Sequence, residues 1–242
     1  MSKIVALLPA RWGSTRFPGK PLHCIAGKPL LQHVWERCLK ARRLDAVVVA
    51  TDDMRIAEAA FAFGAEVALT SKKHPSGTDR IAEVVSKMRG ATHLLNVQGD
   101  EPLVDPALID SLAECLVEEK VPMVTAANPF GPKDDPANPN IVKVVTDLHG
   151  DALYFSRSVI PFIRDAGGKA AYLRHHGIYG YSRRCLLQLV KWPQSSLEKA
   201  EQLEQLRALE NGVRIRVLKT KHVSIGVDVP EDAIRVEKLL RS

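Results

Sequence analysis

Short apolar runs alternate with amphipathic stretches through the first half of the chain. The runs are typical of strands buried on both faces, as in a parallel sheet. They occupy residues 4–8, 46–50, 65–70 and 92–98. Between them, apolar residues recur at helical spacing in residues 29–41, 53–64, 78–88 and 106–119. This order predicts an α/β fold with a mostly parallel central sheet and helices on both faces.

The pattern loosens near residue 120. Residues 128–140 are rich in Pro, Asn and Asp, which is typical of a loop. Further strands are predicted at 141–145, 152–155, 175–182 and 213–218, and further helices at 183–190, 195–212 and 230–240. The helix at 195–212 is so rich in charge that we interpret it as a solvated surface helix. We predict one domain over residues 1–242, with an inserted lobe at about 128–190.

Composition is that of a soluble globular protein, with 45% hydrophobic and 26% charged residues. Because no apolar run is long enough to span a bilayer, we expect no membrane segment. The N-terminus leads straight into a strand-like run, so we expect no signal peptide. The four cysteines are scattered without metal-ligand spacing, which favours reduced thiols and a cytoplasmic location.

Positive charge is concentrated at the start of the chain. Residues 1–43 carry nine Lys or Arg and one Glu, whereas the remaining residues carry 25 Lys or Arg and 27 Asp or Glu. Such a field suits an anionic ligand. Nucleic acid is disfavoured, because aromatic residues make up only 5% of the chain and no basic-aromatic pattern or nucleic-acid motif is present. A small polyphosphate fits better.

The loop "PARWGSTRFPGKP" after the first strand resembles a phosphate-binding P-loop without matching it. Five residues separate Gly13 from Gly19, and Pro21 stands where the metal-binding hydroxyl would be. The glycines still permit close approach of the backbone to a ligand, and the loop leaves the carboxyl end of a strand, where open α/β sheets bind ligands. Its cations and hydroxyls are Arg11, Arg16, Lys20, Ser14 and Thr15. A solvated basic turn remains the alternative.

Two acidic segments are candidates for a metal site. Asp100 and Glu101 follow the strand-like run 92–98, and Asp228 precedes the last helix. A carboxylate at the end of a strand is well placed to hold a hard cation beside a phosphate. If the sheet brings Asp228 near Asp100, the two share a metal. Helix-capping turns are the alternative for both segments.

Two further segments combine polar groups with turns or strands. "HPSGTDRIAE" places a glycine, a hydroxyl and Arg80 at the N-terminus of a helix. Helix N-termini bind anions, and an ordinary capping turn is the alternative. In "RHHGIYGYS", His175 and His176 are adjacent on a strand and therefore face opposite sides. We expect one of them to face a pocket and the other to pack, rather than both to bind one metal ion.

The order of these segments is more specific than any one of them. "LLPARWGSTRFPGKPL", "HPSGTDRIAE", "LLNVQGDEPLV", "LYFSRSVIPF", "RHHGIYGYS", "LEKAEQLEQLRALENG" and "IGVDVPED" together resemble the 3-deoxy-manno-octulosonate (KDO) cytidylyltransferases, from residue 4 to about residue 235. The first and third stretches occur more widely among nucleotidyltransferases. The sequences FSRS-IP, HHGIY and EKAEQLEQLR point to this family.

The resemblance implies a Rossmann-like nucleotidyltransferase fold with an inserted dimerisation lobe. It implies that the protein converts CTP and KDO into CMP-KDO and pyrophosphate, with Mg²⁺ as cofactor, for lipopolysaccharide biosynthesis. It also implies that the protein is a homodimer. Its implied catalytic residues are Arg11, Lys20 and Asp100, and its implied metal ligands are Asp100 and Asp228. The implied nucleotide-binding residues are Ser14, Arg16, Gly77, Arg80 and Gln98. The implied sugar-binding residues are Arg157, His175, Tyr179, Glu204 and Gln205.

Two positions depart from the family pattern, and alternatives stay open. Trp12-Gly13 replaces a tyrosine and alanine-like pair, and His176 replaces an isoleucine, which alters the expected sugar pocket. The first alternative is therefore the same chemistry on 8-amino-KDO or another acid sugar such as a sialic acid. A GT-A glycosyltransferase is disfavoured, because "TDD" and "GDE" match its DxD motif only in part. A nucleotide-sensing module without catalysis is disfavoured by Lys20, Asp100 and Asp228.

Overall fold

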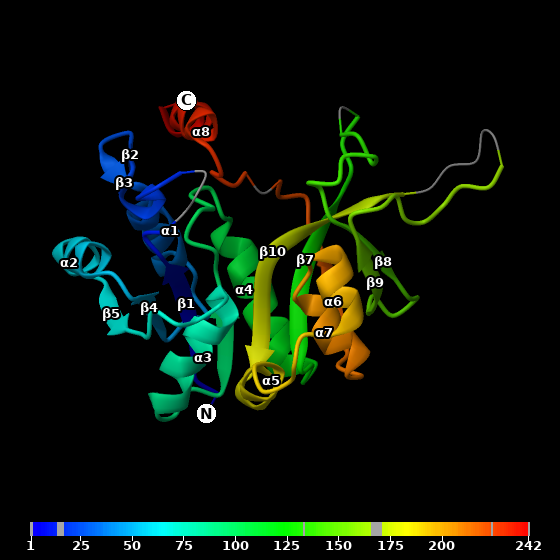
Figure 1. Ribbon diagram of the computed structural model, residues 1–242, viewed down its shortest axis with the longest axis horizontal. Helices are drawn as coiled ribbons and strands as arrows, with labels where there is room; N and C mark the ends of the chain where they lie inside the picture. Colours follow the sequence, from blue (N-terminus) through cyan, green and yellow to red (C-terminus); the bar gives the residue numbers. More distant parts are fainter. Residues whose placement is uncertain (1, 14–16, 133, 166–170, 224, 242) are drawn as a thin grey trace.

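A computed structural model describes residues 2–13, 17–132, 134–165, 171–223 and 225–241. A twisted central sheet runs across the molecule, with its strands in the order β11-β7-β10-β6-β1-β4-β5 (Figure 1). The pairs β1–β4, β1–β6, β4–β5 and β7–β11 are parallel. β10 runs antiparallel to β6 and β7, and β8 and β9 join the sheet through antiparallel pairs with β10 and with each other. The predicted α/β fold with a mostly parallel sheet is therefore confirmed.

The predicted alternation of strands and helices in the first half is confirmed to within a few residues. The strands are β1 (Ile4–Ala10), β4 (Ala46–Thr51), β5 (Glu66–Leu69) and β6 (His93–Asn96). The helices are α1 (Leu30–Leu39), α2 (Met54–Ala62), α3 (Gly77–Lys87) and α4 (Pro106–Glu118). After β1 come a short 3-10 helix, η1 (Lys20–Leu22), and a small hairpin of β2 (Cys24–Ile25) and β3 (Lys28–Pro29), which the apolar pattern did not indicate.

The second half contains β7 (Met123–Pro129), β8 (Lys143–Thr146), β9 (Ala152–Ser156), β10 (Leu173–Ser182) and β11 (Ile215–Lys219). Its helices are α5 (Arg183–Leu189), α6 (Ser196–Glu201), α7 (Gln205–Glu210) and α8 (Pro230–Arg241). Sequence analysis missed β7, although its side chains are almost all buried. Only four residues, 119–122, separate it from α4.

The prediction of one solvated helix over 195–212 was wrong. The helix ends at Glu201, Gln202 adopts a left-handed conformation with φ 54°, and α7 begins after Glu204. The charged surface reading was also wrong, because Glu198, Gln205 and Arg207 are buried. Two short helices thus turn polar side chains inward where one long helix would have directed them to solvent.

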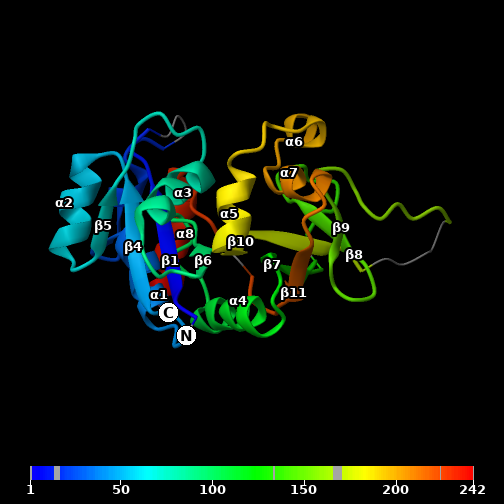
Figure 2. The ribbon, with the colours of Figure 1, turned by 90° about the horizontal axis from the view of Figure 1, so that it is seen from below.

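Helices cover both faces of the sheet, as Figure 2 shows. On one face, α1 and α4 pack on β1, β6 and β10 around a core that includes Leu8, Leu95 and Leu112. On the other face, α3 and α5 pack around Leu7, Ile81 and Leu186. A third, smaller cluster joins α8 to the β2–β3 hairpin through Phe17, Ile25 and Val236. This last contact fixes the end of the chain beside the loop that follows β1.

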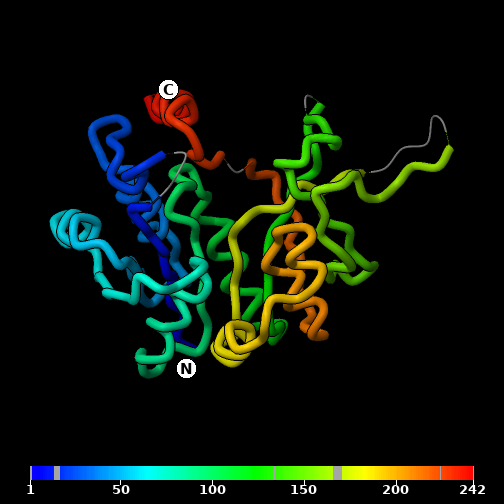
Figure 3. Tube along the Cα trace, in the orientation of Figure 1, coloured from blue at the N-terminus to red at the C-terminus, as the bar shows by residue number. Residues whose placement is uncertain are grey.

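The β8–β9 hairpin, which joins the sheet through the pairing of β8 with β10, and residues 157–165 lie within the range predicted as an inserted lobe. Residues 157–165 extend away from the sheet (Figure 3). β10 lies in the same range but runs in the middle of the sheet. Leu148 and Phe162 in this region expose 103% and 83% of their surface, whereas large apolar side chains are normally covered. A dimer interface here stays a prediction. Among the described residues, none of the helices is long and apolar enough to cross a membrane.

Candidate active site

A pocket of about 420 Å³ lies at the carboxyl ends of β1 and β6. Its walls come from the loop after β1, the start of α3, the turn after β6 and the segment before α8. The residues predicted for catalysis, nucleotide binding and metal binding that line it are Arg11, Lys20, Gly77, Arg80, Gln98, Asp100 and Asp228. Segments up to about 200 residues apart in sequence therefore meet at the edge of the sheet where α/β proteins bind ligands.

Lys20 is the centre of an ionic cluster in this pocket. Its Nζ donates to Asp100 Oδ2 at 2.6 Å and lies 3.5 Å from Asp228 Oδ1. The backbone N–H of Val227 donates to the carbonyl of Asp100 at 2.9 Å, which fixes Asp228 beside it. The two carboxylates predicted to share a metal ion thus converge on one cation, the lysine ammonium.

The donor set suits magnesium that is bound together with a phosphate. Groups of three or more His, Cys, Asp or Glu side chains able to hold a metal do not occur among the described residues. Mg²⁺ usually takes only one or two carboxylates and completes its shell with water and substrate phosphates. Asp100 and Asp228 provide two carboxylates in a pocket that also carries Arg11 and Lys20 for the phosphates. The residues therefore fit Mg²⁺ only as a partner of the substrate.

Two glycines let backbone segments approach closely at the floor of the pocket. A Cβ on Gly77 would lie 3.2 Å from the ring of Pro9, and one on Gly99 would lie 3.1 Å from the carbonyl of Pro9. The start of α3 and the turn after β6 consequently pack directly on the end of β1. Ser76 caps α3 by accepting from the N–H of Asp79. The helix N-terminus is thus presented to the pocket, where it favours an anion.

Arg80 lines the pocket but is held from behind. It is 4% exposed, its Nη2 lies 3.0 Å from Asp52 Oδ1, and its Nη1 donates to Thr70 Oγ1. Asp52 was not predicted to have a role, since "TDD" had been considered only as a partial glycosyltransferase motif. In the structure it fixes the guanidinium of Arg80, which is a supporting function.

The loop after β1 is fastened by Trp12, one of the two departures from the family pattern. Its indole lies against Gly19, where a Cβ would be 3.1 Å from the ring, and its carbonyl accepts from the Gly19 N–H. The guanidinium of Arg55 stacks on the indole ring, 3.5 Å from its centroid. Since Gly19 has φ 69° and caps η1, this contact positions Lys20. Ser14 and Arg16, predicted to bind nucleotide, lie outside the described residues.

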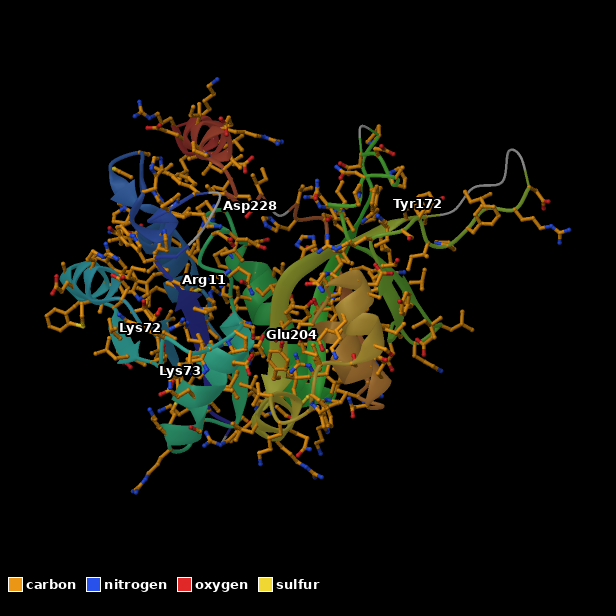
Figure 4. All side chains as sticks on the ribbon, viewed as in Figure 1. Arg11, Lys72, Lys73, Tyr172, Glu204 and Asp228 are labelled. Atoms are coloured by element: carbon orange, nitrogen blue, oxygen red, sulfur yellow. The ribbon has the colours of Figure 1, made fainter. Side chains whose placement is uncertain are left out.

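Glu204 connects the pocket to the second half of the chain (Figure 4). Thr78 donates to its Oε2, and the Ser76 hydroxyl lies 2.9 Å from its Oε1. Burial raises the pKa of this carboxyl above its ordinary value, and the two hydroxyl contacts oppose that shift only in part. The break between α6 and α7 therefore brings a sugar-site candidate against the capping turn of α3.

The other predicted sugar-binding residues surround β10 without lining the 420 Å³ pocket. His175 and Tyr179 lie together with ring centroids 5.4 Å apart, and burial lowers the pKa of His175 to about 3. Gln205 is 5% exposed, and its Nε2 is a buried donor without a hydrogen-bond partner. An unsatisfied buried amide is costly, so this atom marks a place for a polar ligand.

His176 does not belong to this group. It is 2% exposed, and its Nε2 hydrogen-bonds Asn128 Oδ1 at 2.7 Å. The two adjacent histidines have separate neighbours, as expected for consecutive strand residues. The ring of His176 packs inside the protein with Asn128 as a polar partner, and its effect on the sugar pocket stays a prediction.

The guanidinium of Arg157 contacts three backbone carbonyls. It donates to Glu201 at 2.8 Å, to Pro139 at 2.9 Å and to Gln202 at 3.5 Å. A guanidinium has five N–H donors, so these contacts leave two for a ligand. Arg157 also ties the end of β9 to the turn between α6 and α7, which is the turn that carries Glu204.

Comparison with known proteins identifies the family. A family model described as "Cytidylyltransferase" matches residues 5–215. A protein of Geobacter sulfurreducens named 3-deoxy-manno-octulosonate cytidylyltransferase is 53% identical, with 98% of this chain and 99% of that protein covered. One of Solibacter usitatus with the same name is 51% identical, with 99% and 95% covered. This chain belongs to the 3-deoxy-manno-octulosonate cytidylyltransferase family.

A solved structure agrees with that assignment. The chain superimposes with a TM-score of 0.94 and 43% identity on CMP:2-keto-3-deoxy-manno-octonic acid synthetase complexed with CTP, with 99% of both chains covered. The nucleotidyltransferase fold expected from the sequence is thereby confirmed. Sequence analysis missed three residues that hold other side chains in place through contacts between elements. Asp52 pairs with Arg80, Arg55 stacks on Trp12, and Glu198 pairs with Arg207.

Proposed function

We propose that this protein transfers the cytidylyl group of CTP to the anomeric hydroxyl of KDO, giving CMP-KDO and pyrophosphate. The anomeric oxygen forms a bond to the α-phosphorus, and the bond from that phosphorus to the bridging oxygen breaks. The electron pair leaves with pyrophosphate, and the hydroxyl proton is released to solvent. The observation that carries the proposal is the ionic cluster of Lys20, Asp100 and Asp228 inside the pocket.

The chain's own contribution is charge neutralisation and positioning. Arg11, Lys20 and the N-terminus of α3 would bind the triphosphate, because all three line one pocket and favour anions. Arg80 and Gln98 would lie at the cytidine. A nucleotidyl transfer gains most from in-line placement and from stabilising the departing pyrophosphate, so no covalent protein intermediate is required.

The sugar would bind between β10 and the turn that carries Glu204. Arg157 retains two N–H donors, which suit the KDO carboxylate because a guanidinium pairs with it bidentately. His175, Tyr179, Glu204 and Gln205 would meet the sugar hydroxyls. The hydrogen bonds of Glu204 to Ser76 and Thr78 place this region directly beside the pocket.

Asp100 and Asp228 would hold Mg²⁺ together with the substrate oxygens. The bound ion would offset phosphate charge and lower the pKa of the attacking hydroxyl, so a dedicated protein base is not needed. The same two carboxylates contact the ammonium of Lys20. Asp100 and Asp228 would therefore serve both as ligands of the ion and as anchors of Lys20.

Asp228→Asn is expected to raise the Mg²⁺ concentration for half-maximal rate by about 10- to 100-fold, because one of the two charged ligands is lost. A Mg²⁺ titration of pyrophosphate release at saturating CTP and KDO measures it. Glu231→Gln, an exposed carboxylate three residues away, is the matched control and should leave the titration unchanged. An unchanged titration for Asp228→Asn would show that Asp228 only shapes the turn before α8.

Glu204→Gln is expected to lower kcat/KM for KDO by about 10- to 100-fold, because an amide group replaces a buried carboxyl oxygen that the proposed sugar would contact. It should also stabilise the protein. Because burial raises the pKa of Glu204, the folded chain keeps a proton that the unfolded chain loses above the ordinary carboxyl pKa of 4.5. Wild-type stability therefore falls as pH rises from there through the raised pKa, whereas glutamine does not titrate.

Urea unfolding of both proteins from pH 4 to pH 8 measures this. The stability advantage of Glu204→Gln should be smallest in acid and should grow with pH. Glu58→Gln, an exposed glutamate on α2, should show no such trend. An advantage that shrinks with pH would mean that the carboxylate is stabilised in the folded state.

We also propose a homodimer in the cytoplasm. The exposed Leu148 and Phe162 on the extended lobe support a contact with a second copy, and all four cysteines are free thiols. Sedimentation of the wild type and of Phe162→Ser tests the dimer, which should weaken in the variant.

Export of the protein from the cell would contradict the proposed cytoplasmic location.

A panel of sugar acids tests the proposed function. Pyrophosphate release is followed with CTP and Mg²⁺ fixed and with KDO, 8-amino-KDO or a sialic acid as acceptor. We expect the highest kcat/KM with KDO. A higher kcat/KM with another acid would make that acid the substrate in place of KDO. CTP binding without turnover of any acid would indicate a nucleotide-sensing module. Release of free nucleotide from a preformed nucleotide sugar would indicate a GT-A glycosyltransferase.

A further inference from the structure

Strand β10 is interrupted beside the proposed sugar site. His176 pairs with Ala126 of β7, but the next pair is Tyr179 with Thr125, so Gly177 and Ile178 bulge out of the ladder. A bulge leaves backbone carbonyls without their usual ladder partners, and buried carbonyls need other donors. Gln98 donates to the carbonyl of Gly177 at 3.2 Å. Gln98 lines the pocket that is predicted to bind CTP.

Thr125 meets the remaining carbonyls of the bulge. It is fully buried, with its Oγ1 2.8 Å from the carbonyl of Ile178 and 3.2 Å from that of His176. Its third neighbour is the Nε2 of His175, at 3.0 Å. The methyl and hydroxyl of one threonine thus lie at the junction of the bulge and a sugar-site candidate.

The number of protons decides how these contacts are made. A hydroxyl has one proton to donate and lone pairs to accept with, whereas a carbonyl oxygen only accepts. The carbonyl of Ile178 is the closest acceptor and takes the hydroxyl proton. The contact with His175 is then possible only if the ring nitrogen is the donor. This arrangement requires the proton of the His175 ring on Nε2 and a lone pair on Nδ1.

The environment keeps the ring neutral. Burial lowers the pKa of His175 to about 3, and the neighbouring His176 adds to that shift. The ring packs between Phe155 and Tyr179, with centroids at 4.9 and 5.4 Å. A neutral imidazole with a fixed tautomer presents one donor and one acceptor. Here the donor is used by Thr125, which leaves the acceptor for a ligand.

We propose that Thr125 is a positioning residue that sets the tautomer of His175, so that Nδ1 accepts a hydrogen bond from a hydroxyl of the sugar acid. This inference rests on the proposed function, because it assigns His175 to the sugar. Thr125 itself is fully buried and touches no substrate. Its hydroxyl joins the bulge, and through Gln98 the nucleotide pocket, to the acceptor site.

The test compares Thr125→Val, which removes only the hydroxyl, with Thr125→Ser, which keeps it. Histidine ring nitrogens of the ¹⁵N-labelled protein without substrate are observed by long-range ¹H–¹⁵N NMR at pH 7.5, with His175 assigned from His175→Gln. In the wild type and Thr125→Ser, we expect the proton on Nε2. In Thr125→Val, that proton should exchange with water at least about tenfold faster or be lost from the spectrum.

Kinetics provide the second readout. Thr125→Val should raise KM for KDO by about five- to tenfold, the effect of one hydrogen bond, while KM for CTP stays near the wild-type value. The variant should melt at a lower temperature than the wild type, because the buried carbonyl of Ile178 loses its donor. Thr125→Ser should restore KM for KDO. A wild-type proton on Nδ1 overturns the proposal without any variant, even if Thr125→Val fails to fold. An unchanged His175 signal or an unchanged KM for KDO in folded Thr125→Val also overturns it.

The two proposals fail in different ways. If the wild type releases no pyrophosphate with any sugar acid, the proposed function fails while the tautomer spectrum is still measurable. If turnover with KDO is normal and the proton lies on Nδ1, only the role of Thr125 fails.

Discussion

Lys20→Ala is expected to lower kcat by about 10²–10³-fold, the usual effect of removing a charge-stabilising group from a catalytic site. Lys20 Nζ lies 2.6 Å from Asp100 and 3.5 Å from Asp228. Without the ammonium, the pocket loses a positive charge that offsets these two carboxylates. We propose that the same charge stabilises the departing pyrophosphate, which gains charge in the transition state. Steady-state pyrophosphate release with CTP, KDO and Mg²⁺ measures the effect.

The variant should remain folded, because the Lys20 side chain is at the surface of the pocket, with 15% of it exposed. Lys28→Ala is the matched control. Lys28 forms a 2.8 Å surface ion pair with Glu36 on the same part of the chain, with 45% of its side chain exposed. It should keep wild-type turnover, since such pairs contribute little. Near-normal turnover of Lys20→Ala would remove Lys20 from the mechanism.

Asp100→Asn should lose turnover to a similar extent, because Asp100 is both the closer partner of Lys20 and the proposed ligand of Mg²⁺. Excess Mg²⁺ should not restore its kcat, whereas it should restore much of the rate of Asp228→Asn. This difference separates a ligand that positions the catalytic lysine from one that mainly holds the ion. Equal rescue of both variants by Mg²⁺ would contradict the separation.

The sequence predicted well those features that follow from the pattern of residues within one short segment. Apolar runs and helical spacing located the strands and helices of the first half, because a buried parallel strand has to be apolar throughout. The loop that carries Lys20 and the turn that carries Asp100 were located because both follow such strands. The meeting of Asp100 with Asp228 was only conditional in the sequence, since it depends on a backbone contact between residues 100 and 227.

The features that were missed depend on distant partners. Residues 195–212 have the composition of an exposed helix, but a left-handed Gln202 divides it and turns Glu198 and Arg207 toward each other. Asp52 gained a role only through Arg80, and Arg55 only through Trp12. Thr125 is an ordinary strand residue until the bulge in β10 places three groups around its hydroxyl. None of these relations has a sequence period that a local pattern would reveal.

Glu198→Ala is expected to destabilise the protein by about 3–5 kcal/mol, because it leaves a buried charge without its partner. Arg207 donates to both carboxylate oxygens of Glu198, at 2.7 and 2.5 Å, and the two side chains are only 7% and 6% exposed. The pair joins α6 to α7, and Glu198 also accepts from the N–H of Ser195 in a capping box. Chemical unfolding in urea at pH 7 measures the loss.

The same pair holds the turn that carries Glu204 and Gln205, two residues of the proposed sugar site. At temperatures where Glu198→Ala is still folded, the loss of this pair should loosen the turn between α6 and α7. KM for KDO should therefore rise more than KM for CTP. Lys87→Ala, which breaks the exposed pair with Glu83, should cost at most about 1 kcal/mol and leave both KM values unchanged. Replacing Glu198 and Arg207 together by methionine should recover most of the stability, because no unpaired charge remains. A loss below about 1 kcal/mol for Glu198→Ala would mean that water reaches Arg207 and that the two helices are held by their apolar contacts alone.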